Sequence, residues 1–300
     1  MLAERSTAAH YGRMKAFPLL ALAVLAFSSC ATLALPPNSL ASVPDQAPAW
    51  AALGSGIEYA SFASTNPRVE ACALRIDLRA KGLEPVVTPC EGGMTHSQYV
   101  TSFARQFDCE AAVNAAPFEP SSAIEGERRK VVGLTMANGV VMSPPVPPMA
   151  VLFIRRDDDG GLRGEVTLQS SDSGLAHGGQ QEIVAAVGGF TIVLSDGKPE
   201  GSSSREPRTA VGLSPDARVL FILVADGRRR DSAGLTNYET GLWLAWLGAS
   251  SGMTLDGGGS STMAIRDASG MIRLANIPID GGKRGRERAV GSCLGFQTTR

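Results

Sequence analysis

Residues 255–263, with the sequence LDGGGSSTM, have the residue types of an anion-binding and catalytic loop. Three consecutive glycines can present their backbone N–H groups to an anion without obstruction by side chains. Short hydroxyl groups add donors, and Asp256 places a carboxylate beside them, where it can position a nucleophile or take a proton. A plain Gly/Ser turn is the structural alternative. The stretch predicts Asp256 as a catalytic residue and the following residues as binding residues: Gly257, Gly258, Gly259, Ser260, Ser261 and Thr262.

Short strands joined by tight turns must position this loop. Apolar and polar residues alternate from Cys72 to Arg79, a period of two that predicts a half-buried strand. Residues 208–213 and 219–225 are joined by Ser-Pro-Asp-Ala and predict an antiparallel hairpin. We expect a second hairpin from residues 183–187 and 191–194.

Helices contribute less to the pattern than strands do. Residues 100–107 have apolar positions at helical spacing, after Thr95 and Ser97, either of which can cap a helix. Thr236 and Glu239 form a capping box ahead of a second apolar helix. The whole pattern predicts an α+β fold, a mostly antiparallel β-sheet with a few packed helices in a single catalytic-type domain.

Several motifs occur in the order seen in the phosphodiester glycosidase family, which the chain resembles from about Val69 to Phe296. They include RTAVG from residue 208, VADGR ending at 228, LDGGGSSTM, NIP from 276 and RERAVG from 286. Gly188 and Gly189 also resemble a Gly-Gly segment of the family. One motif departs, since Asn114-Ala115-Ala116-Pro117-Phe118 stands where the family usually has Asn-Gly-Gly-Phe-Phe. We expect the loss of both glycines to narrow the backbone choices and alter the substrate pocket.

The resemblance implies an exported hydrolase that cleaves the bond between a sugar's anomeric carbon and a phosphodiester, of the N-acetylglucosamine-1-phosphodiester type. Asp256 and Asp226 are then candidates for the two carboxylates that a glycosidase commonly uses. Arg208 and Arg288 are candidate phosphate contacts, because a guanidinium matches phosphate oxygens. Asn114 can orient a substrate hydroxyl or phosphate, and Gly188 and Gly189 join the predicted binding residues.

Several alternatives to this function and these roles stay open. The chain can be a non-catalytic envelope lipoprotein that binds a phosphorylated or acidic glycan, or a glycosidase of a non-phosphorylated amino-sugar polysaccharide. Asp226-Gly227 can simply form a turn, and the arginines can be surface charges. No cofactor is required, although Asp256 or Asp226 is compatible with a divalent cation, Ca²⁺ or Mg²⁺. The sequence leaves the metal site unknown.

The N-terminus predicts export to a bacterial cell envelope. Residues 16–35 are apolar and uncharged and follow Arg13 and Lys15, the charge order of a secretory leader, which we place at residues 1–35 with Met14 as the expected start. Phe-Ser-Ser before Cys30 resembles a lipobox, so lipidation at Cys30 and a lipoprotein in the periplasm or at the surface are the first interpretation. Cleavage after Ala34 and an uncleaved anchor of about 20 residues are the others.

The composition of the rest of the chain indicates where its linker and its domain lie and which partners are expected. Residues 36–49 are rich in Pro, Ser and Ala and predict a flexible linker to a domain over residues 50–300. With 28 basic against 29 acidic residues and no basic tract, we expect no nucleic-acid partner. The expected partners are a sugar phosphodiester or envelope glycan, and a membrane reached through the N-terminal lipid or anchor. Beyond the leader, four cysteines can form two disulfides or lie buried as small hydrophobes: Cys72, Cys90, Cys109 and Cys293.

Overall fold

The computed structural model describes residues 42–121, 124–172 and 182–299. The predicted leader, its start at Met14, the cleavage position after Ala34 and lipidation at Cys30 lie outside these residues. Part of the predicted linker, residues 42–49, is described and has neither helix nor strand. Nowhere in the described ranges does a helix combine the length and the apolar character needed to cross a membrane.

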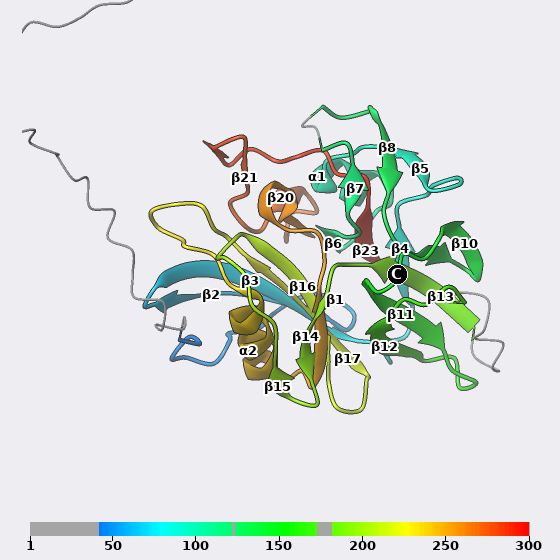
Figure 1. Ribbon diagram of the computed structural model, residues 1–300. Coiled ribbons are helices and arrows are strands. Elements are labelled where there is room, and N and C mark those ends of the chain that lie inside the picture. The colour runs from blue at the N-terminus through cyan, green and yellow to red at the C-terminus, as the bar shows by residue number, and fades with distance from the viewer. Residues whose placement is uncertain (1–41, 122–123, 173–181, 300) are drawn as a thin grey trace, which may run out of the picture. The chain divides into compact units, whose positions relative to one another are not determined.

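Antiparallel sheets make up most of the fold (Figure 1). The largest sheet has, in spatial order, β1 (Ala51–Gly54), β2 (Ile57–Thr65), β3 (Arg68–Asp77), β17 (Val219–Ala225), β16 (Arg208–Leu213), β18 (Ser251–Thr254), β14 (Ile192–Ser195) and β15 (Lys198–Pro199). A second sheet has β10 (Val140–Ser143), β9 (Thr135–Ala137), β13 (Glu182–Gly188), β11 (Ala150–Arg156) and β12 (Leu162–Leu168). A third has β20 (Ile272–Leu274), β19 (Met263–Arg266), β6 (Ala111–Asn114), β23 (Cys293–Thr298) and β4 (Leu83–Val87).

Two small sheets and a short helical turn complete the strand framework. The first small sheet has β5 (Met94–His96), β8 (Arg128–Val131) and β7 (Phe118–Glu119). The second is the hairpin of β21 (Ile279–Asp280) and β22 (Lys283–Arg284). The turn is the 3₁₀ helix η1 (Gly258–Ser260), which lies within the predicted loop.

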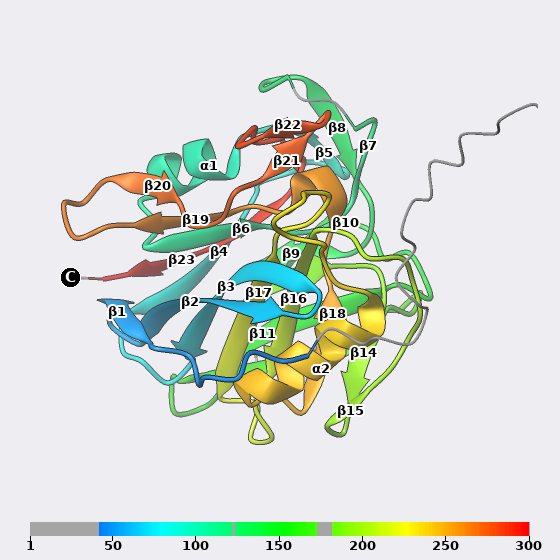
Figure 2. The same ribbon diagram turned by 90° about the vertical axis from the view of Figure 1, so that its left-hand side faces the viewer.

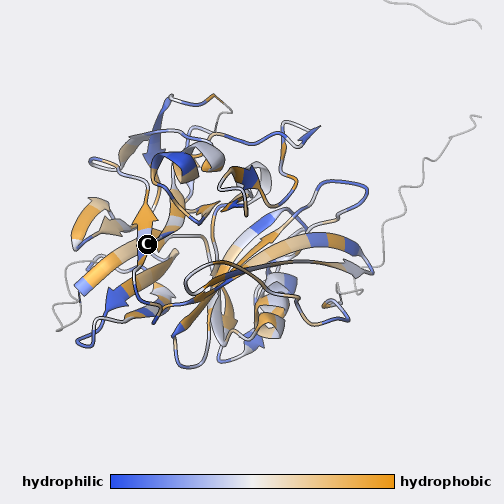
Figure 3. Cartoon of the chain, turned by 180° about the vertical axis from the view of Figure 1, so that it is seen from behind, coloured by the Kyte–Doolittle hydropathy of each residue, from blue (hydrophilic) through white to orange (hydrophobic). Residues whose placement is uncertain are grey.

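The central core is shared by the three large sheets. Alternate residues of β3, namely Cys72, Leu74 and Ile76, belong to this core, whereas Ala71 and Ala73 face a second cluster on the other side of the sheet. Hydrophobic residues accordingly concentrate in the strands, and hydrophilic residues in the loops (Figure 3). The alternation in the sequence correctly predicts β3 and its two faces.

Helix α2 (Asn237–Leu247) covers that second cluster and begins at the predicted capping box. Thr236 accepts a hydrogen bond from the backbone N–H of Glu239, and Glu239 accepts one from Thr236, which confirms the prediction. Gly241 lets the helix approach β14 closely, because a Cβ there would lie 2.0 Å from the carbonyl oxygen of Val193.

The other predicted helix is shorter than expected. Helix α1 (Val100–Gln106) begins after Tyr99, so the prediction of a cap at Thr95 or Ser97 is wrong. Their hydroxyl groups donate to the carbonyl oxygens of Pro89 and Ile124 instead. Since α1 and α2 are the α-helices that the described residues form, the fold is mostly β rather than α+β.

The two predicted hairpins have different outcomes. β16 and β17 form the expected antiparallel pair. β13 and β14, however, belong to different sheets, so the hairpin predicted around Gly188-Gly189 is wrong. The chain passes between sheets there, because the N–H groups of Gly189 and Phe190 donate to Ala150 and Thr254 of different sheets.

The four cysteines among the described residues are free thiols. Cys72, Cys109 and Cys293 are buried and Cys90 is half-buried. The interpretation as small buried hydrophobes therefore holds for three of them.

Candidate active site

The candidate site lies where the inner strands β16, β17 and β18 of the eight-stranded sheet begin or end (Figure 2). β16 pairs antiparallel with both β17 and β18, so the start of β16 lies beside the ends of β17 and β18. Arg208, Asp226 and Asp256 therefore lie there. The end of β6 in the neighbouring sheet brings Asn114 to the same place, where its side chain bonds to the backbone of Asp256.

Asn114 is fully buried and holds both ends of the predicted loop. Its Nδ2 donates to the carbonyl oxygen of Asp256 over 2.6 Å. Its Oδ1 accepts from Thr209 Oγ1 at 2.7 Å and from the backbone N–H of Thr262 at 3.1 Å. The polar atoms of Asn114 thus face protein groups, and the geometry makes it a positioning residue for Asp256.

The alanines that follow Asn114 fit the backbone without strain. Ala115 and Ala116 have no left-handed φ, and both are buried, with 0% and 1% of their surface exposed. The backbone N–H of Asp256 donates to the carbonyl oxygen of Ala115 over 2.9 Å. Alanines in place of the two family glycines therefore leave intact the hydrogen bond that supports the loop at Asp256. That they alter the substrate pocket stays a prediction.

The Asp256 carboxyl has the electrostatics of an acid or base that works near neutral pH. Burial raises its pKa from 3.8 to about 6, and this outweighs the nearby Ser260 hydroxyl, the charge of Arg288 and the N–H of Gly257, which all lower it. Gly257 donates to Asp256 Oδ1 over 3.0 Å. A carboxyl with a pKa near the working pH is suited to proton transfer.

The glycine loop offers fewer free N–H groups than the sequence predicts. Gly257 donates to Asp256 and Gly258 donates to the carbonyl oxygen of Pro207. Ser260 and Ser261 donate back to Gly257 and Gly258 within the turn. These N–H groups already have protein partners, so the expected backbone cradle is largely occupied by the protein itself.

Arginine side chains lie over the glycines instead. A Cβ at Gly259 would lie 2.4 Å from Arg288 Nη2 and 2.8 Å from Asp280 Oδ1, so glycine is needed there for the guanidinium to lie on the backbone. Arg288 pairs with the buried Asp280 at 2.7 Å. The predicted residue Arg288 is thus in the site, held by a carboxylate that sequence reasoning missed.

Arg228 occupies the equivalent position over Gly258, and sequence reasoning missed it too. A Cβ at Gly258 would lie 3.1 Å from Arg228 Nη2, and Arg228 pairs with Glu206 at 2.5 Å. Arg228 has a φ of 55°, an uncommon left-handed conformation for a bulky residue that marks a position under constraint. Its place at the end of the V-A-D-G-R motif is the sequence signal that points to it.

Arg208 lies close to Arg228 but has protein partners. Its Nε donates to the carbonyl oxygen of Leu235 over 3.0 Å, and its Nη2 donates to Ser203 Oγ and to the carbonyl oxygen of Ser204, each over 2.8 Å. Burial, together with the charge of Arg228, lowers the pKa of Arg208. Its guanidinium fastens the loop before β16 to the start of α2, and adds positive charge to the site.

Asp226 is engaged through both carboxylate oxygens. It accepts from Arg229 Nη1 at 2.8 Å, from Asn276 Nδ2 at 2.8 Å and from the N–H of Ile277. Asn276 in turn donates to Ser261 O and accepts from the N–H of Met263. Burial raises the pKa of Asp226 against the lowering effects of Asn276 and Arg229. The structure therefore places Asp226 behind the loop, where it supports Asn276.

The other predicted binding residues differ in what they contact. Gly189 allows a close approach of strands, because a Cβ there would lie 2.3 Å from Thr254 O, and a Cβ at Gly188 would lie 3.1 Å from Gln169 Nε2. Ser261 and Thr262 have buried hydroxyl oxygens without a hydrogen-bond partner in the described residues. These oxygens lie below the surface, so a role of Ser261 and Thr262 in binding stays a prediction.

Binding of a divalent cation at Asp256 or Asp226 stays a prediction. Within residues 42–121, 124–172 and 182–299, no group of three or more His, Cys, Asp or Glu side chains can hold a metal ion. The oxygens of Asp226 face an arginine and amide donors, and Asp256 lies near Arg288. Both candidate carboxylates therefore have positively charged or amide neighbours in the structure.

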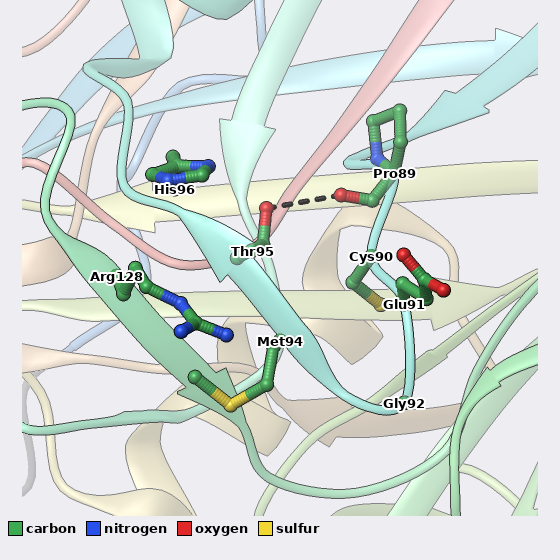
Figure 4. Close-up of a pocket in the computed structure, with 8 residues that line it drawn as sticks. All are labelled: Pro89, Cys90, Glu91, Gly92, Met94, Thr95, His96 and Arg128. Atoms are coloured by element: carbon green, nitrogen blue, oxygen red, sulfur yellow. Dashed lines mark hydrogen bonds between the residues drawn. The ribbon is translucent and has the colours of Figure 1, made fainter.

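A hollow of about 850 Å³ lies outside the candidate site, on the sheet of β5 and β8 (Figure 4). Met94 and His96 of β5 line it beside Arg128 of β8, and Cys90 lies at its other side. Burial raises the pKa of the Cys90 thiol to about 11, so this thiol is not activated as a nucleophile. None of the predicted site residues lines this hollow.

Replacing Asp256 by Asn is expected to stabilise the fold at neutral pH. The pKa of Asp256 is about 6 in the folded protein and 3.8 as its ordinary value. The free energy of unfolding of the wild type therefore falls as the pH rises from the lower to the higher of these values. Asparagine has no charge to bury, so its free energy of unfolding should exceed that of the wild type by about 2 kcal/mol at about pH 7.5 and by little at about pH 4. Urea unfolding at both pH values measures the difference. An equal or lower stability of the variant at the higher pH would contradict it.

Comparison with known proteins finds one curated relative of similar sequence. The chain is 25% identical over 231 residues to the SPbeta prophage-derived uncharacterized protein YomE of Bacillus subtilis strain 168. The aligned residues cover 70% of this chain and 33% of YomE. The chain thus spans about a third of the length of that curated relative.

Two solved structures have a similar fold. The catalytic domain of zebrafish N-acetylglucosamine-1-phosphodiester alpha-N-acetylglucosaminidase, auto-inhibited by its pro-peptide, has a TM-score of 0.62 at 20% identity, over 85% of this chain and 87% of that one. A Burkholderia pseudomallei K96243 protein that is thought to be exported has a TM-score of 0.59 at 16% identity, over 76% of this chain and 74% of that one.

The family comparison covers the whole site from Asn114 to Arg288. A family model described as phosphodiester glycosidase matches residues 107–297, which include β6, β16, β17, β18 and the loop after Asp256. The chain belongs to the phosphodiester glycosidase family.

Proposed function

We propose that this protein is an exported hydrolase that cleaves the bond between a sugar's anomeric carbon and a phosphodiester. The observation that carries the proposal is the placement of two guanidinium groups, Arg228 and Arg288, on the glycines that follow Asp256. A planar guanidinium matches the oxygens of a phosphate. A proton-transfer group and an anion clamp on one short loop are what this reaction requires.

In the proposed reaction, Asp256 takes a proton from water while the water oxygen attacks the anomeric carbon. The bond from that carbon to the phosphate oxygen breaks, and its electron pair leaves with the phosphate. The products are a free sugar and a phosphomonoester. Arg228 and Arg288 would stabilise the charge that develops on the phosphate, so the leaving group needs little protonation.

The partner and location of the protein are part of the same proposal. A sugar phosphodiester of the N-acetylglucosamine-1-phosphate type is the proposed substrate, supported by the family and by the name of the zebrafish enzyme with the similar fold. Location in the cell envelope, with lipidation at Cys30, is proposed on the leader sequence.

The direct test is product analysis with the purified chain. A panel of methyl sugar-1-phosphodiesters, including that of N-acetylglucosamine, should yield free sugar and methyl phosphate in mass spectra. Release of sugar from a phosphate-free amino-sugar polysaccharide instead would favour the other glycosidase. Absence of turnover across the panel would reject hydrolysis of this bond.

The pH dependence of the reaction should report Asp256. Because the carboxylate form acts as base and its pKa is about 6, kcat/KM should rise about tenfold per pH unit below that value and level off above it. The substrate phosphodiester does not titrate in this range. Initial rates across this range measure the profile, and a flat profile would remove Asp256 as the base.

A further inference from the structure

A small pocket lies behind the glycine loop. It has a volume of about 330 Å³, and Asp226 and Asn276 are among the residues that line it. Asn276 donates to Ser261 O and accepts from the N–H of Met263, so one wall of the pocket also supports the loop. Asp256 does not line the pocket, which is therefore separate from the candidate catalytic carboxyl. We call it the Asn276 pocket.

The charged groups of the Asn276 pocket balance one another. Its lining includes three arginines and three acidic residues: Arg68, Arg229, Arg284, Glu70, Asp226 and Asp231. Each guanidinium pairs with one or two of these carboxylates, over 2.5–3.1 Å. Charge therefore favours neither an anion nor a cation in the pocket.

Buried hydrogen bonds hold the floor of the pocket in position. The side chains of Asp226 and Arg229 are only 5% and 4% exposed and pair with each other at 2.8 Å. Ser232 Oγ donates to the carbonyl oxygen of Asp226 and accepts from the N–H of Glu70, which fastens the end of β17 to β3. The pocket is thus largely preformed, as binding sites for small molecules usually are.

At the rim, the ion pairs leave polar atoms for a ligand. Arg68 contacts Oε1 of Glu70 and leaves Oε2, and the side chain of Glu70 is 34% exposed. Arg284 contacts Asp231 through Nη2, and its side chain is 53% exposed. Glu70 therefore offers an acceptor and Arg284 offers donors. A hydroxyl group both donates and accepts, so a ligand with several hydroxyls can bond to both.

The rest of the wall is apolar. Ala71, Ala275 and Ile277 line it, and Ile277 is 37% exposed although its side chain is large and hydrophobic. The C–H faces of a sugar ring match this wall and its hydroxyls match the rim, whereas an inorganic ion matches only the rim. The volume lies near the lower end of the usual range of about 300–1,000 Å³, so the occupant is small.

We propose that the Asn276 pocket binds one uncharged sugar unit, as a carbohydrate site separate from the phosphate position at Arg228 and Arg288. Glu70 and Arg284 bond to the hydroxyls of the sugar, and Ile277 packs against its ring. This inference goes beyond the proposed hydrolysis and does not depend on it, because a sugar can occupy the pocket whether or not the glycine loop is catalytic.

The test is an NMR titration of the purified chain with uncharged methyl glycosides, which requires no turnover. The probes are the methyl glycosides of glucose, mannose, galactose and N-acetylglucosamine, and at least one should bind saturably. Glu70→Ala should weaken that binding about tenfold, since it removes a hydrogen bond to a charged group. The matched control is Glu58→Ala. Glu58 is 35% exposed and pairs with Arg75 at 2.6 Å on the same sheet, but does not line the pocket.

A second variant blocks the pocket without removing a charge. Ser61 of β2 is exposed and lines the pocket, so Ser61→Trp should fill its mouth and abolish binding. Its control is Val140→Trp, which adds an indole to the edge strand β10 at a position that is 62% exposed. This control should bind the glycoside as the wild type does.

The outcomes separate this inference from the proposed reaction. Absence of saturable binding by all four glycosides overturns the inference. Equal effects of Glu70→Ala and Glu58→Ala overturn it too, as does unchanged binding by Ser61→Trp. Selective loss in a protein that hydrolyses no sugar phosphodiester supports the pocket and rejects only the hydrolysis. Hydrolysis of a methyl sugar-1-phosphodiester without selective loss rejects only the pocket.

Discussion

Asp256→Asn should lower kcat by about 10²- to 10⁴-fold, the range that a positioned general base usually contributes. The amide cannot take the proton of the attacking water. It can still accept the hydrogen bond of Gly257, so the loop should keep its conformation. Steady-state kinetics on the best methyl sugar-1-phosphodiester gives the change, which should appear in kcat more than in KM because the phosphate contacts are untouched.

The control for this change is Asp216→Asn, at the exposed turn between β16 and β17. It removes the same charge from the same sheet and should retain wild-type kcat. If Asp256→Asn binds orthophosphate normally and keeps more than about a tenth of the wild-type kcat, Asp256 is not the base. Loss of kcat with intact orthophosphate binding would also separate an enzyme from a lipoprotein that only binds glycans.

Arg288→Ala should lower kcat/KM by about ten- to a hundredfold, because a hydrogen bond to a charged group contributes about 1.5–3 kcal/mol. It should also shift the acidic limb of the pH profile. Arg288 lowers the pKa of Asp256, so its removal should move that pKa further above about 6. Rates measured from acid to neutral pH give both effects, and a lower rate with an unmoved limb would contradict the placement of Arg288 beside Asp256.

Folding must be controlled in this variant, since the buried Asp280 would lose its nearer partner and keep only Arg286, 3.8 Å away. The double variant Arg288→Ala/Asp280→Asn removes the uncompensated charge and should recover the thermal midpoint. It should not recover kcat/KM. Recovery of activity together with stability would mean that Arg288 acts only through the fold.

How much of the fold can be predicted depends on the separation of the partners in the chain. The hairpin of β16 and β17 and the cap at Thr236 are set by neighbouring residues, and both were predictable. The strands on either side of Gly188-Gly189 were predictable as strands but not as members of different sheets. Their partners are β11 and β18, which no local pattern identifies.

The same distinction holds within the site. Asp256 and the glycines form one short motif, and its edge position followed from the strand before it. The arginine contacts with Gly258 and Gly259 could not be predicted, because they join separate motifs through side chains. The contact of Asp226 with Asn276 could not be predicted either, because the two residues belong to separate motifs, and a catalytic role of Asp226 stays a prediction.

Asn114 ties the assembly of the candidate site to strands that are far apart in the sequence. The backbone N–H of Thr262, which bonds to Asn114 Oδ1, lies 148 residues further on, and Cys293 of β23 lies opposite Asn114. Contacts between such distant residues form late, because the loop between them must first be closed. The candidate site is therefore assembled only when β23 has joined the sheet of β6, so removal of β23 should disorder a loop that lies more than thirty residues before it in the sequence.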